Sequence, residues 1–320
     1  MSRGVRVLVT GGAGFIGSHL VDRLVESEYD VRVLDNLSTG NLANIENHVE
    51  VGSVDFVEGD IRDIDLVARA MKDVDVVCHL AAIVSVPFSV KNPDLTFDVN
   101  VGGTNNLLRS AADAGVVKFV FVSSCAVYGD PEYLPLDEKA KLNPISPYAA
   151  SKLAGEKLCL DYVENRGFNS AVVRFFNVYG LRQGLSEYSG VITKFFDRAR
   201  KGLPLLIYGD GLQTRDFVNV HDVVTALLAC MENSRAEGEI FNIGTGKPVT
   251  VNELAKTILG LLGLDLEVRH ERARKGEIIH SYGDITKARK LLGYKPTVAL
   301  GDGLRVLLGE GVFVEEFRDE

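Results

Sequence analysis

The chain has 320 residues, of which 46% are hydrophobic, and a formal net charge of −9 at pH 7. This length is enough for two domains with sizeable cores. The acidic balance and the absence of a long basic run argue against a nucleic-acid partner, and no apolar run approaches the roughly 20 residues of a membrane span. We therefore expect neither nucleic acid nor membrane as a partner. The first residues lead directly into a strand and do not resemble a signal peptide.

Four cysteines, Cys78, Cys125, Cys159 and Cys230, are scattered along the chain. Their spacing fits no metal-ligand motif, so no metal site is expected. We interpret all four as small core or near-core residues of a protein in the reducing cytoplasm.

Apolar, β-branched runs alternate with helical stretches through the first half of the chain. In chain order we expect a strand at 5–10, a helix at 15–27, strands at 31–34 and 54–57, a helix at 64–71, a strand at 74–80, a helix at 93–114, a strand at 116–123, a helix at 148–165 and a strand at 171–175. The strands are continuously apolar rather than alternating, which indicates a parallel sheet covered on both faces. The predicted fold is therefore α/β, a doubly wound parallel sheet of the Rossmann type.

The pattern becomes glycine-rich and irregular after residue 175. A helix at 221–231 and a strand at 240–243 are typical of a return to the sheet, and further helices are expected at 250–262 and 285–292. We predict a first domain at 1–174, to which 217–243 returns, and a smaller, irregular substrate-binding domain at 175–320. The second domain should lie outside the carboxyl ends of the strands, where ligands bind in such folds.

A glycine turn follows the first predicted strand. Gly11 permits a tight turn, Gly14 lets the backbone approach a pyrophosphate, and Gly17 allows close packing of the following helix. Asp35 ends the second strand, near the position expected for the acid that binds the adenosine ribose. Because a carboxylate there repels a 2′-phosphate, the turn predicts NAD rather than NADP. A glycine turn without a ligand is the alternative, but strand, turn, helix and acid are all in place.

Four further residues lie at or just after the ends of the next two strands. Asp60 follows the third strand, where its carboxylate could receive the adenine amino group or could equally be a solvated turn acid. His79 ends the fourth strand and is interpreted as structural rather than catalytic. The small Ala81 and Ala82 that come after it would let a cofactor lie flat against the backbone.

The chemistry depends on Tyr148 and Lys152, which lie four residues apart on one helix face. A free tyrosine has a pKa near ~10, and lowering it to ~7 requires about 4 kcal/mol, which one cation at ~4 Å supplies at an effective dielectric constant of ~20. We therefore expect Lys152, with help from the positive nicotinamide ring, to be sufficient to activate Tyr148. Taken alone, this spacing is more often a core tyrosine and a solvated lysine. Ser123 and Ser124 change that assessment, because they end an apolar strand where a parallel sheet presents its ligands. Ser124 is read as a hydrogen-bonding group, since no serine-nucleophile motif surrounds it.

Together these motifs resemble the extended branch of the short-chain dehydrogenase/reductase superfamily, and within it the NAD-dependent nucleotide-sugar epimerase/dehydratase family. The resemblance covers nearly the whole chain. The segments that carry it are 10–20, 35–40, 79–82, 123–129, 148–152, 174–180, 208–222 and 241–246, with Asn100.

The resemblance implies a 4-epimerase that interconverts UDP-glucose and UDP-galactose through a 4-keto sugar. It makes Tyr148 the general base, Lys152 the residue that binds the ribose and lowers the Tyr148 pKa, and Ser124 the group that orients the 4-hydroxyl. The cofactor residues it implies are Gly11, Gly14, Phe15, Ile16, Gly17, Asp35, Asn36, Ser38, Gly40, Asp60, Ile61, Leu80, Ala81, Ala82, Asn100, Ser123, Tyr148 and Lys152. NAD would be retained between turnovers.

The same resemblance implies a set of substrate residues: Ser85, Ser124, Asn177, Val191, Leu206, Tyr208, Arg215, Arg274, Glu277 and Ser281. Asn177, Arg215 and Arg274 would bind the diphosphate, because a guanidinium fork holds its oxygens bidentately. Glu277 would bind the uridine ribose. The small Ser281 would leave room for a 2-acetamido group, so we also expect N-acetylated UDP-sugars to enter. A shift of one residue in the register would place Tyr282 there instead and reverse this expectation.

The family resemblance also implies a homodimer, paired through the helices at 93–114 and 148–165. Cys125 and Ala126 stand where sugar 4,6-dehydratases carry an Asp–Glu pair, so elimination of water is not expected. A UDP-glucuronate decarboxylase or epimerase on the same scaffold stays open as an alternative. A non-catalytic NAD-sensing protein is the other alternative, although such a protein should have lost Tyr148 or Lys152.

Overall fold

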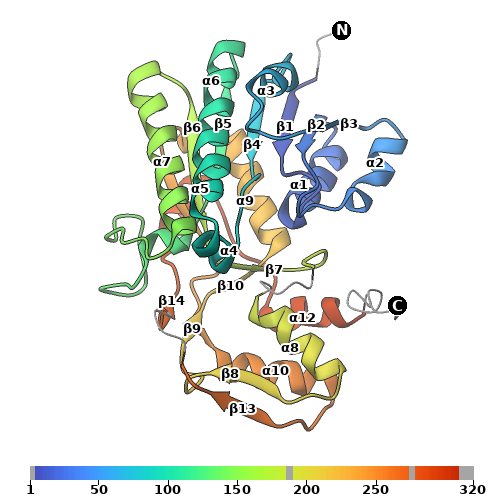
Figure 1. Ribbon diagram of the computed structural model, residues 1–320, viewed down its shortest axis with the longest axis vertical. Coiled ribbons are helices and arrows are strands. Elements are labelled where there is room, and N and C mark those ends of the chain that lie inside the picture. The colour runs from blue at the N-terminus through green and yellow to red at the C-terminus, as the bar shows by residue number, and fades with distance from the viewer. Residues whose placement is uncertain (1–3, 185–189, 274–277, 310–320) are drawn as a thin grey trace.

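The computed structural model describes residues 4–184, 190–273 and 278–309. Its centre is a seven-stranded sheet in the order β11-β6-β5-β4-β1-β2-β3, in which every neighbouring pair is parallel (Figure 1). The strands are β1 (Arg6–Thr10), β2 (Asp30–Asp35), β3 (Val54–Glu58), β4 (Val76–His79), β5 (Lys118–Ser124), β6 (Ser170–Phe175) and β11 (Ile240–Ile243). The order reverses between β1 and β4, and ligands bind at such a reversal. The doubly wound fold class is confirmed.

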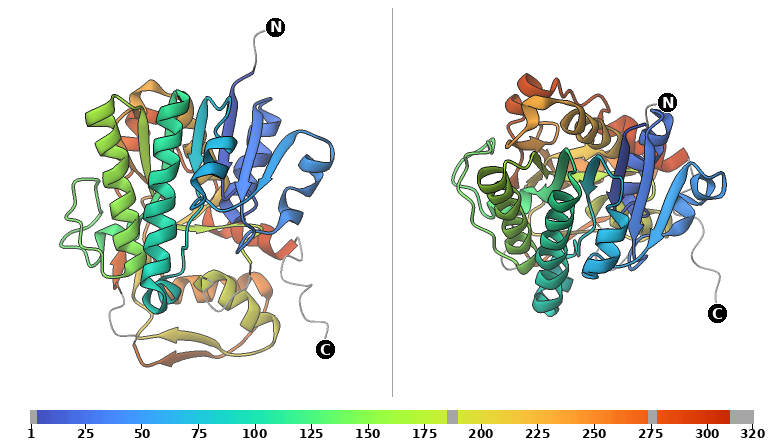
Figure 2. Two further views of the ribbon diagram at one scale, coloured as in Figure 1. Left: turned by 45° about the horizontal axis from the view of Figure 1, so that its top comes forward. Right: turned by 90° about the horizontal axis from the view of Figure 1, so that it is seen from above.

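Helices cover both faces of this sheet (Figure 2). One face carries α1 (Phe15–Glu26), α9 (Val220–Glu232) and α11 (Thr286–Leu292), packed on a core that is largely valine. The opposite face carries α3 (Ile64–Ala70), α6 (Thr104–Ala114) and α7 (Pro147–Arg166). Short helices α2 (Glu46–Glu50) and α4 (Val86–Lys91) lie in loops. The continuous apolar strands are thus explained, because both sides of the sheet are buried.

The helix expected at 93–114 is interrupted. It consists of α5 (Pro93–Phe97), a wide π-type turn called η2 (Asp98–Gly103) and α6. Within the turn the Asn100 carbonyl accepts a bond of 2.6 Å from the Thr104 hydroxyl. Gly103 packs so closely on Ile61 that a side chain there would overlap it. The wide turn therefore aims the buried Asn100 side chain toward the loop after β4.

A second lobe lies below the sheet in Figure 1 and has its own apolar core. Around it are α8 (Val191–Arg200), β8 (Leu205–Tyr208), α10 (Val251–Leu262), β13 (Val268–Glu271) and α12 (Leu300–Gly309). Short strands join the lobes: β7 (Asn177–Tyr179) with β10 (Phe217–Asn219), and β9 (Thr214–Arg215) with β12 (Val249–Thr250) and β14 (His280–Ser281). The sheet core extends past the predicted boundary, since Ile285, Ala288 and Tyr294 also belong to it.

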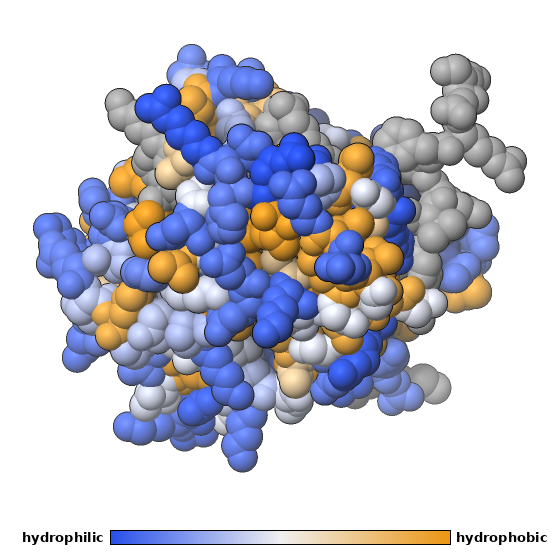
Figure 3. Space-filling model, turned by 90° about the horizontal axis from the view of Figure 1, so that it is seen from below, coloured by the Kyte–Doolittle hydropathy of each residue, from blue (hydrophilic) through white to orange (hydrophobic). Residues whose placement is uncertain are grey.

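On the face of the molecule seen from below, apolar side chains form patches that are interrupted by hydrophilic ones (Figure 3). Among the described residues no helix is long and apolar enough to cross a membrane. Cys78, Cys159 and Cys230 are buried, and Cys125 is half-buried.

Candidate functional site

The glycine turn after β1 is shaped for close contact. A β-carbon at Gly11 would lie 2.8 Å from the main-chain nitrogen of Ala81, and one at Gly17 would overlap the Gly11 carbonyl. Helix α1 begins at Gly14 with no side-chain cap, and its first bond runs from the Ser18 nitrogen to the Gly14 carbonyl (3.0 Å). The N–H groups of the first turn, including Phe15 and Ile16, therefore point out of the helix start, where they suit an anion such as a pyrophosphate.

Asp35 is buried between this turn and the loop after β2. Its carboxylate accepts hydrogen bonds from the main-chain nitrogens of Ala13 (3.0 Å) and Leu37 (2.8 Å). Desolvation raises the Asp35 pKa, and these two bonds oppose the rise. A β-carbon at Gly40 would stand 3.1 Å from the carboxylate oxygens, so the loop can pass over them only as glycine. Each oxygen keeps capacity for a hydroxyl donor such as a ribose.

Asp60 already has partners within the chain. Both of its oxygens bind the Arg62 guanidinium, at 3.0 and 2.8 Å, and Asn36 donates a further bond of 3.2 Å. The Arg62 bonds lower the Asp60 pKa to about 2. A contact with an adenine amino group would have to share this carboxylate. Neighbouring Ser38 is exposed, while Ile61 is buried, so that Ile61 could meet a cofactor only through its main chain.

The segment after β4 is fixed by buried polar bonds. Both ring nitrogens of His79 are engaged, with the Thr10 hydroxyl at 2.7 Å and the Thr104 hydroxyl at 2.8 Å, and burial lowers the His79 pKa to about 3. This environment fits a structural histidine. Asn100 exchanges two bonds with the main chain of Ile83, of 2.7 and 2.9 Å. Half-buried Leu80, Ala81 and Ala82 lie between these anchors, and Ser85 caps α4 by accepting from a main-chain nitrogen.

The predicted reactive groups meet at the end of β5. Ser146 caps α7 and Pro147 opens it, which places Tyr148 in the first turn. The Tyr148 hydroxyl lies near the side chain of Ser124, the last residue of β5, which acts to lower the Tyr148 pKa. Lys152 lies one turn further along α7, 3% exposed. The structure therefore brings all three predicted catalytic residues to one place.

The electrostatics of this group differ from the expectation. Desolvation raises the Tyr148 pKa to about 12, against which the Ser124 side chain acts. The Lys152 ammonium donates to the Val122 carbonyl at 2.9 Å and lies 5.1 Å above the Phe121 ring. Burial lowers the Lys152 pKa to about 8. In the chain without ligands, burial therefore opposes the activation of Tyr148 that we expect from Lys152 together with the positive nicotinamide ring, and that activation stays a prediction.

Ser123, predicted at the cofactor, turns its side chain the other way. Its hydroxyl donates a bond of 2.5 Å to Glu156 of α7, and Arg174 of β6 binds the same carboxylate. Any contact between Ser123 and a cofactor would therefore come from its main chain. The sequence interpretation missed Glu156; the signal was its spacing, four residues after Lys152 on the same helix face.

Three of the predicted substrate residues lie where β6 and the joining strands end. The buried Oδ1 of Asn177 has no hydrogen-bond partner among the described residues, as expected of a group that waits for a ligand. Arg215 and Ser281 are paired in register on β9 and β14. The Ser281 hydroxyl lies 4.0 Å from the sulfur of Cys125, which directly follows Ser124. Asn177 lies beside this group, because its main-chain nitrogen donates a hydrogen bond to the carbonyl of Asp216, the residue that follows Arg215.

Asp216 is a second residue that the sequence interpretation missed. It is fully buried, and its carboxylate accepts from the Thr245 nitrogen (2.7 Å), the Thr245 hydroxyl (2.6 Å) and the Gly246 nitrogen (2.9 Å). A weaker bond of 3.4 Å comes from Gly283. Asp216 thereby ties the segment that carries Arg215 to the loops after β11 and β14. Its position directly after a predicted ligand was the available signal.

Leu206 and Tyr208 lie on β8, which pairs only with β13 in the described part of the chain. The nitrogens of Leu205 and Gly209 bond to the β13 side, so the main chain of Leu206 and Tyr208 faces the other edge. The Tyr208 carbonyl accepts from the Gln213 amide at 2.8 Å. Val191, half-buried, opens α8. Arg274 and Glu277 lie outside the described residues.

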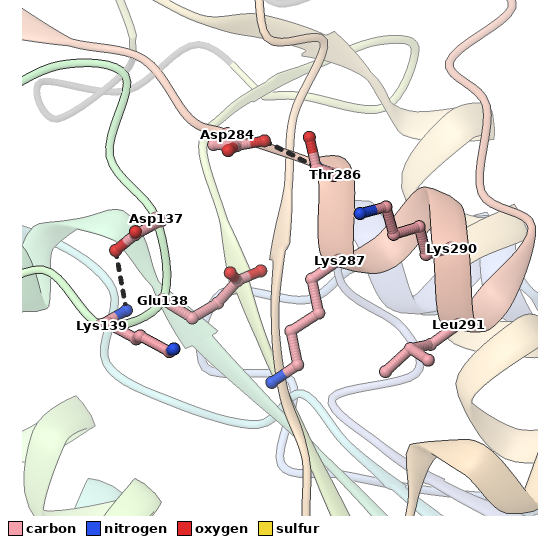
Figure 4. Close-up of a pocket in the computed structure, with 8 residues that line it drawn as sticks. All are labelled: Asp137, Glu138, Lys139, Asp284, Thr286, Lys287, Lys290 and Leu291. Carbon is pink, nitrogen blue, oxygen red and sulfur yellow. Dashed lines mark hydrogen bonds between the residues drawn. The ribbon is translucent and has the colours of Figure 1, made fainter.

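A separate cavity of about 390 Å³ lies beside the edge strand β11 (Figure 4). The residues that line it are Asp137, Glu138, Lys139, Asp284, Thr286, Lys287, Lys290 and Leu291. Several of its charges are already bound: Glu138 accepts from the Asn242 nitrogen at 2.8 Å and Lys287 pairs with Glu239 at 2.6 Å. None of the predicted site residues lines this cavity.

The fold and the grouped side chains define a dinucleotide-binding protein with a Tyr–Lys pair on helix α7. The sequence profile of the NAD dependent epimerase/dehydratase family matches residues 7–244. The chain therefore belongs to the NAD-dependent epimerase/dehydratase family, an extended short-chain dehydrogenase/reductase type, and its NAD dependence is confirmed.

Individual relatives agree. UDP-glucose 4-epimerase of Mycolicibacterium smegmatis is 40% identical over 302 residues, 94% of this chain and 96% of that protein. The crystal structure of UDP-glucose 4-epimerase with UDP-glucose from Thermotoga maritima has a TM-score of 0.89 and 39% identity, over 94% of this chain and 97% of the other. UDP-N-acetylglucosamine 4-epimerase from Methanobrevibacter ruminantium, in complex with UDP-N-acetylmuramic acid, has a TM-score of 0.90 and 36% identity, over 95% and 96%. These similarities support a UDP-sugar 4-epimerase.

Proposed function

We propose that the protein interconverts UDP-glucose and UDP-galactose as a 4-epimerase with retained NAD. The observation that carries this proposal is the meeting of the Tyr148 and Ser124 side chains at the end of β5, with Lys152 one turn away on α7. A hydroxyl pair at this edge of the sheet fits a secondary alcohol of a sugar. The relatives that act on UDP-sugars support the same reaction.

The residues of the chain have distinct tasks in this reaction. Ser124 orients the sugar 4-hydroxyl, and Tyr148 removes its proton and later gives it back. When bound, NAD would supply the acceptor and donor of the hydride at C4, so that the sugar passes through a 4-ketone. The configuration at C4 inverts because the ketone turns over in the pocket before the hydride returns to its opposite face. The glycine turn and Asp35 hold the dinucleotide, and Lys152 holds positive charge beside it. Cys125 lacks the acid needed to eliminate water, which separates this reaction from a 4,6-dehydratase.

The other end of the substrate is a diphosphate and a base. The guanidinium of Arg215 can donate to the diphosphate oxygens, and Asn177 can do so through its amide nitrogen, while its unpartnered Oδ1 suits a hydroxyl or N–H donor of the ligand. The outward main chain of Leu206 and Tyr208 suits the edge of a base. We assign NAD to residues 1–174, together with 217–243, and the nucleotide sugar to 175–320.

N-acetylated UDP-sugars are a second substrate class that one observation favours. Ser281 is small and lies next to Cys125, beside the reactive group. The relative that acts on UDP-N-acetylglucosamine supports this extension. UDP-glucuronate, the substrate of the alternative decarboxylase or epimerase, would require a cation or hydroxyls at the C6 carboxylate.

A product analysis tests these proposals directly. The purified protein is incubated separately with UDP-glucose, UDP-N-acetylglucosamine and UDP-glucuronate, and the products are separated by chromatography. Appearance of UDP-galactose from UDP-glucose is expected. Conversion of UDP-glucuronate alone would replace the proposal by its alternative.

We also propose a homodimer. Leu95 and Phe97 of α5 are exposed at 39% and 40% and offer apolar surface that a second copy could cover. Ala150 and Ala154 of α7 are half-buried and permit close helix packing. Two small residues of these helices pack within the same chain instead: Gly103 contacts Ile61, and Gly155 contacts Phe121.

A further inference from the structure

Glu156 continues the line of Tyr148 and Lys152 along α7, one helical turn further on. Its side chain is buried, with 1% exposure. Three bonds hold the carboxylate: the Ser123 hydroxyl donates at 2.5 Å, and the Arg174 guanidinium donates through Nε at 2.9 Å and Nη2 at 2.7 Å. Ser123 and Arg174 are register partners on β5 and β6. One carboxylate therefore ties the reactive helix to the ends of two neighbouring strands.

Arg174 extends this connection to the segment behind Ser124. Its Nη1 donates to the Tyr128 hydroxyl at 2.9 Å and to the Glu138 carbonyl at 3.2 Å. The Tyr128 hydroxyl in turn donates to Asn242 at 2.6 Å. A two-bond fork between guanidinium and carboxylate fixes orientation as well as distance. A buried ion pair of this kind contributes little net stability, so its value here lies in geometry.

The Glu156–Arg174 ion pair also contributes to the electrostatic environment of Lys152. The titratable groups that face its ammonium are Glu156 and Cys159 from α7 and His79 from β4. Burial raises the pKa of the Cys159 thiol and lowers that of His79 to about 3, so both are neutral at pH 7. Glu156 raises the Lys152 pKa against the desolvation that lowers it to about 8. Of these groups, Glu156 supplies the negative charge.

We propose that Glu156, held by Arg174, is a positioning residue that sets Tyr148 and Lys152 against Ser124 and keeps the Lys152 ammonium charged. This inference rests on the proposed function, in which Tyr148 and Lys152 carry the chemistry. It assigns Glu156 no contact with substrate or cofactor.

The charge role is tested on the cofactor-free protein. Lysine labelled with ¹³C at Cε is titrated by NMR, and the Lys152 signal is assigned by its loss in Lys152→Arg. In Glu156→Gln the midpoint should fall by about one pH unit or more, because the Arg174 cation is left unbalanced nearby. Asp222→Asn is the matched control: Asp222 is also a buried carboxylate, 2% exposed, but it binds Thr297 and Val298 instead. An unchanged midpoint in Glu156→Gln would overturn the charge role.

The positioning role is tested by Glu156→Gln/Arg174→Met, which removes both charges and leaves the surroundings of Lys152 neutral. The Lys152 midpoint should return toward the wild-type value. Turnover should still fall about tenfold or more, with KM little changed, because the helix is no longer tied to the two strands. Wild-type turnover in the double variant would overturn the positioning role. This variant also carries the test if Glu156→Gln alone does not fold, since a neutral replacement of a buried ion pair is tolerated better than one unpaired charge.

Failure of this inference is distinguishable from failure of the proposed function. If the wild-type protein converted no UDP-sugar, the proposed function would be refuted. The lysine titration uses neither cofactor nor substrate and would still decide the charge role of Glu156.

Discussion

Ser281→Tyr should close the pocket to N-acetylated sugars. Ser281 is fixed by the pairing of β14 with β9, is 6% exposed, and lies 4.0 Å from the sulfur of Cys125. A phenol ring at this position would therefore occupy the space next to Ser124 rather than swing into solvent. The structure favours Ser281 over Tyr282 for this position, because it is the Ser281 hydroxyl that lies next to Cys125.

The expected change in substrate preference follows from the pocket volume that the tyrosine ring would fill. One methylene in a tight pocket changes transition-state binding by ~1–3 kcal/mol, and an acetamido group exceeds a hydroxyl by more than one methylene. We therefore expect the ratio of kcat/KM for UDP-N-acetylglucosamine over UDP-glucose to fall about 100-fold, which corresponds to ~2.7 kcal/mol.

The assay measures kcat/KM for both substrates in wild type, Ser281→Tyr and Ser281→Ala. The alanine variant removes only the hydroxyl and should leave the ratio close to that of the wild type. An unchanged ratio in the tyrosine variant, or a wild-type protein that rejects the acetamido sugar outright, would refute this reading of Ser281.

Three further outcomes are expected. Tyr148→Phe keeps the ring but removes the base, so turnover should fall about 100-fold or more while NAD stays bound; near-normal epimerisation would remove Tyr148 from the mechanism. Mass spectrometry of the cofactor released by denaturation should find NAD, because the Asp35 carboxylate repels a 2′-phosphate, and recovery of mainly NADP would contradict that role. Light scattering at micromolar concentration should give the mass of a dimer, and a monomer mass would count against the pairing through α5 and α7.

The sheet could be predicted from the sequence because its strands are short, continuous and apolar. Each predicted strand of the first half agrees with an observed strand to within a few residues. The second lobe was harder, since β9, β12 and β14 have only two residues each and their pairing depends on segments far apart in the chain. Helix α8 did carry a signal, with Ile192, Phe195 and Phe196 buried on one face.

One part of the candidate site, the glycine turn, could be predicted because a single short motif determines its geometry. Gly11, Gly14 and Gly17 follow from local turn geometry. Side-chain direction was not predictable, and Ser123 illustrates why: its partners Glu156 and Arg174 come from α7 and β6, which lie beside it only after the sheet has formed. Pattern reasoning places a residue at a strand end but does not choose the neighbour that its hydroxyl will bind.

Tyr148 shows why the interaction of one pair of groups does not suffice to predict a pKa. A single cation at close range is sufficient, on paper, to bring a tyrosine pKa near neutrality. In the folded chain desolvation acts in the opposite direction and raises the Tyr148 pKa to about 12, while the Lys152 ammonium is bound to the Val122 carbonyl. Since the chain alone leaves Tyr148 protonated at neutral pH, its basicity has to come from charge and hydrogen bonds that arrive with the ligands. Ligand-free Tyr148 should accordingly show no tyrosinate absorbance at pH 8, a measurement made simple by the lack of tryptophan in this chain. Tyrosinate that is present in wild type and absent in Tyr148→Phe at that pH would show that Lys152 is sufficient after all.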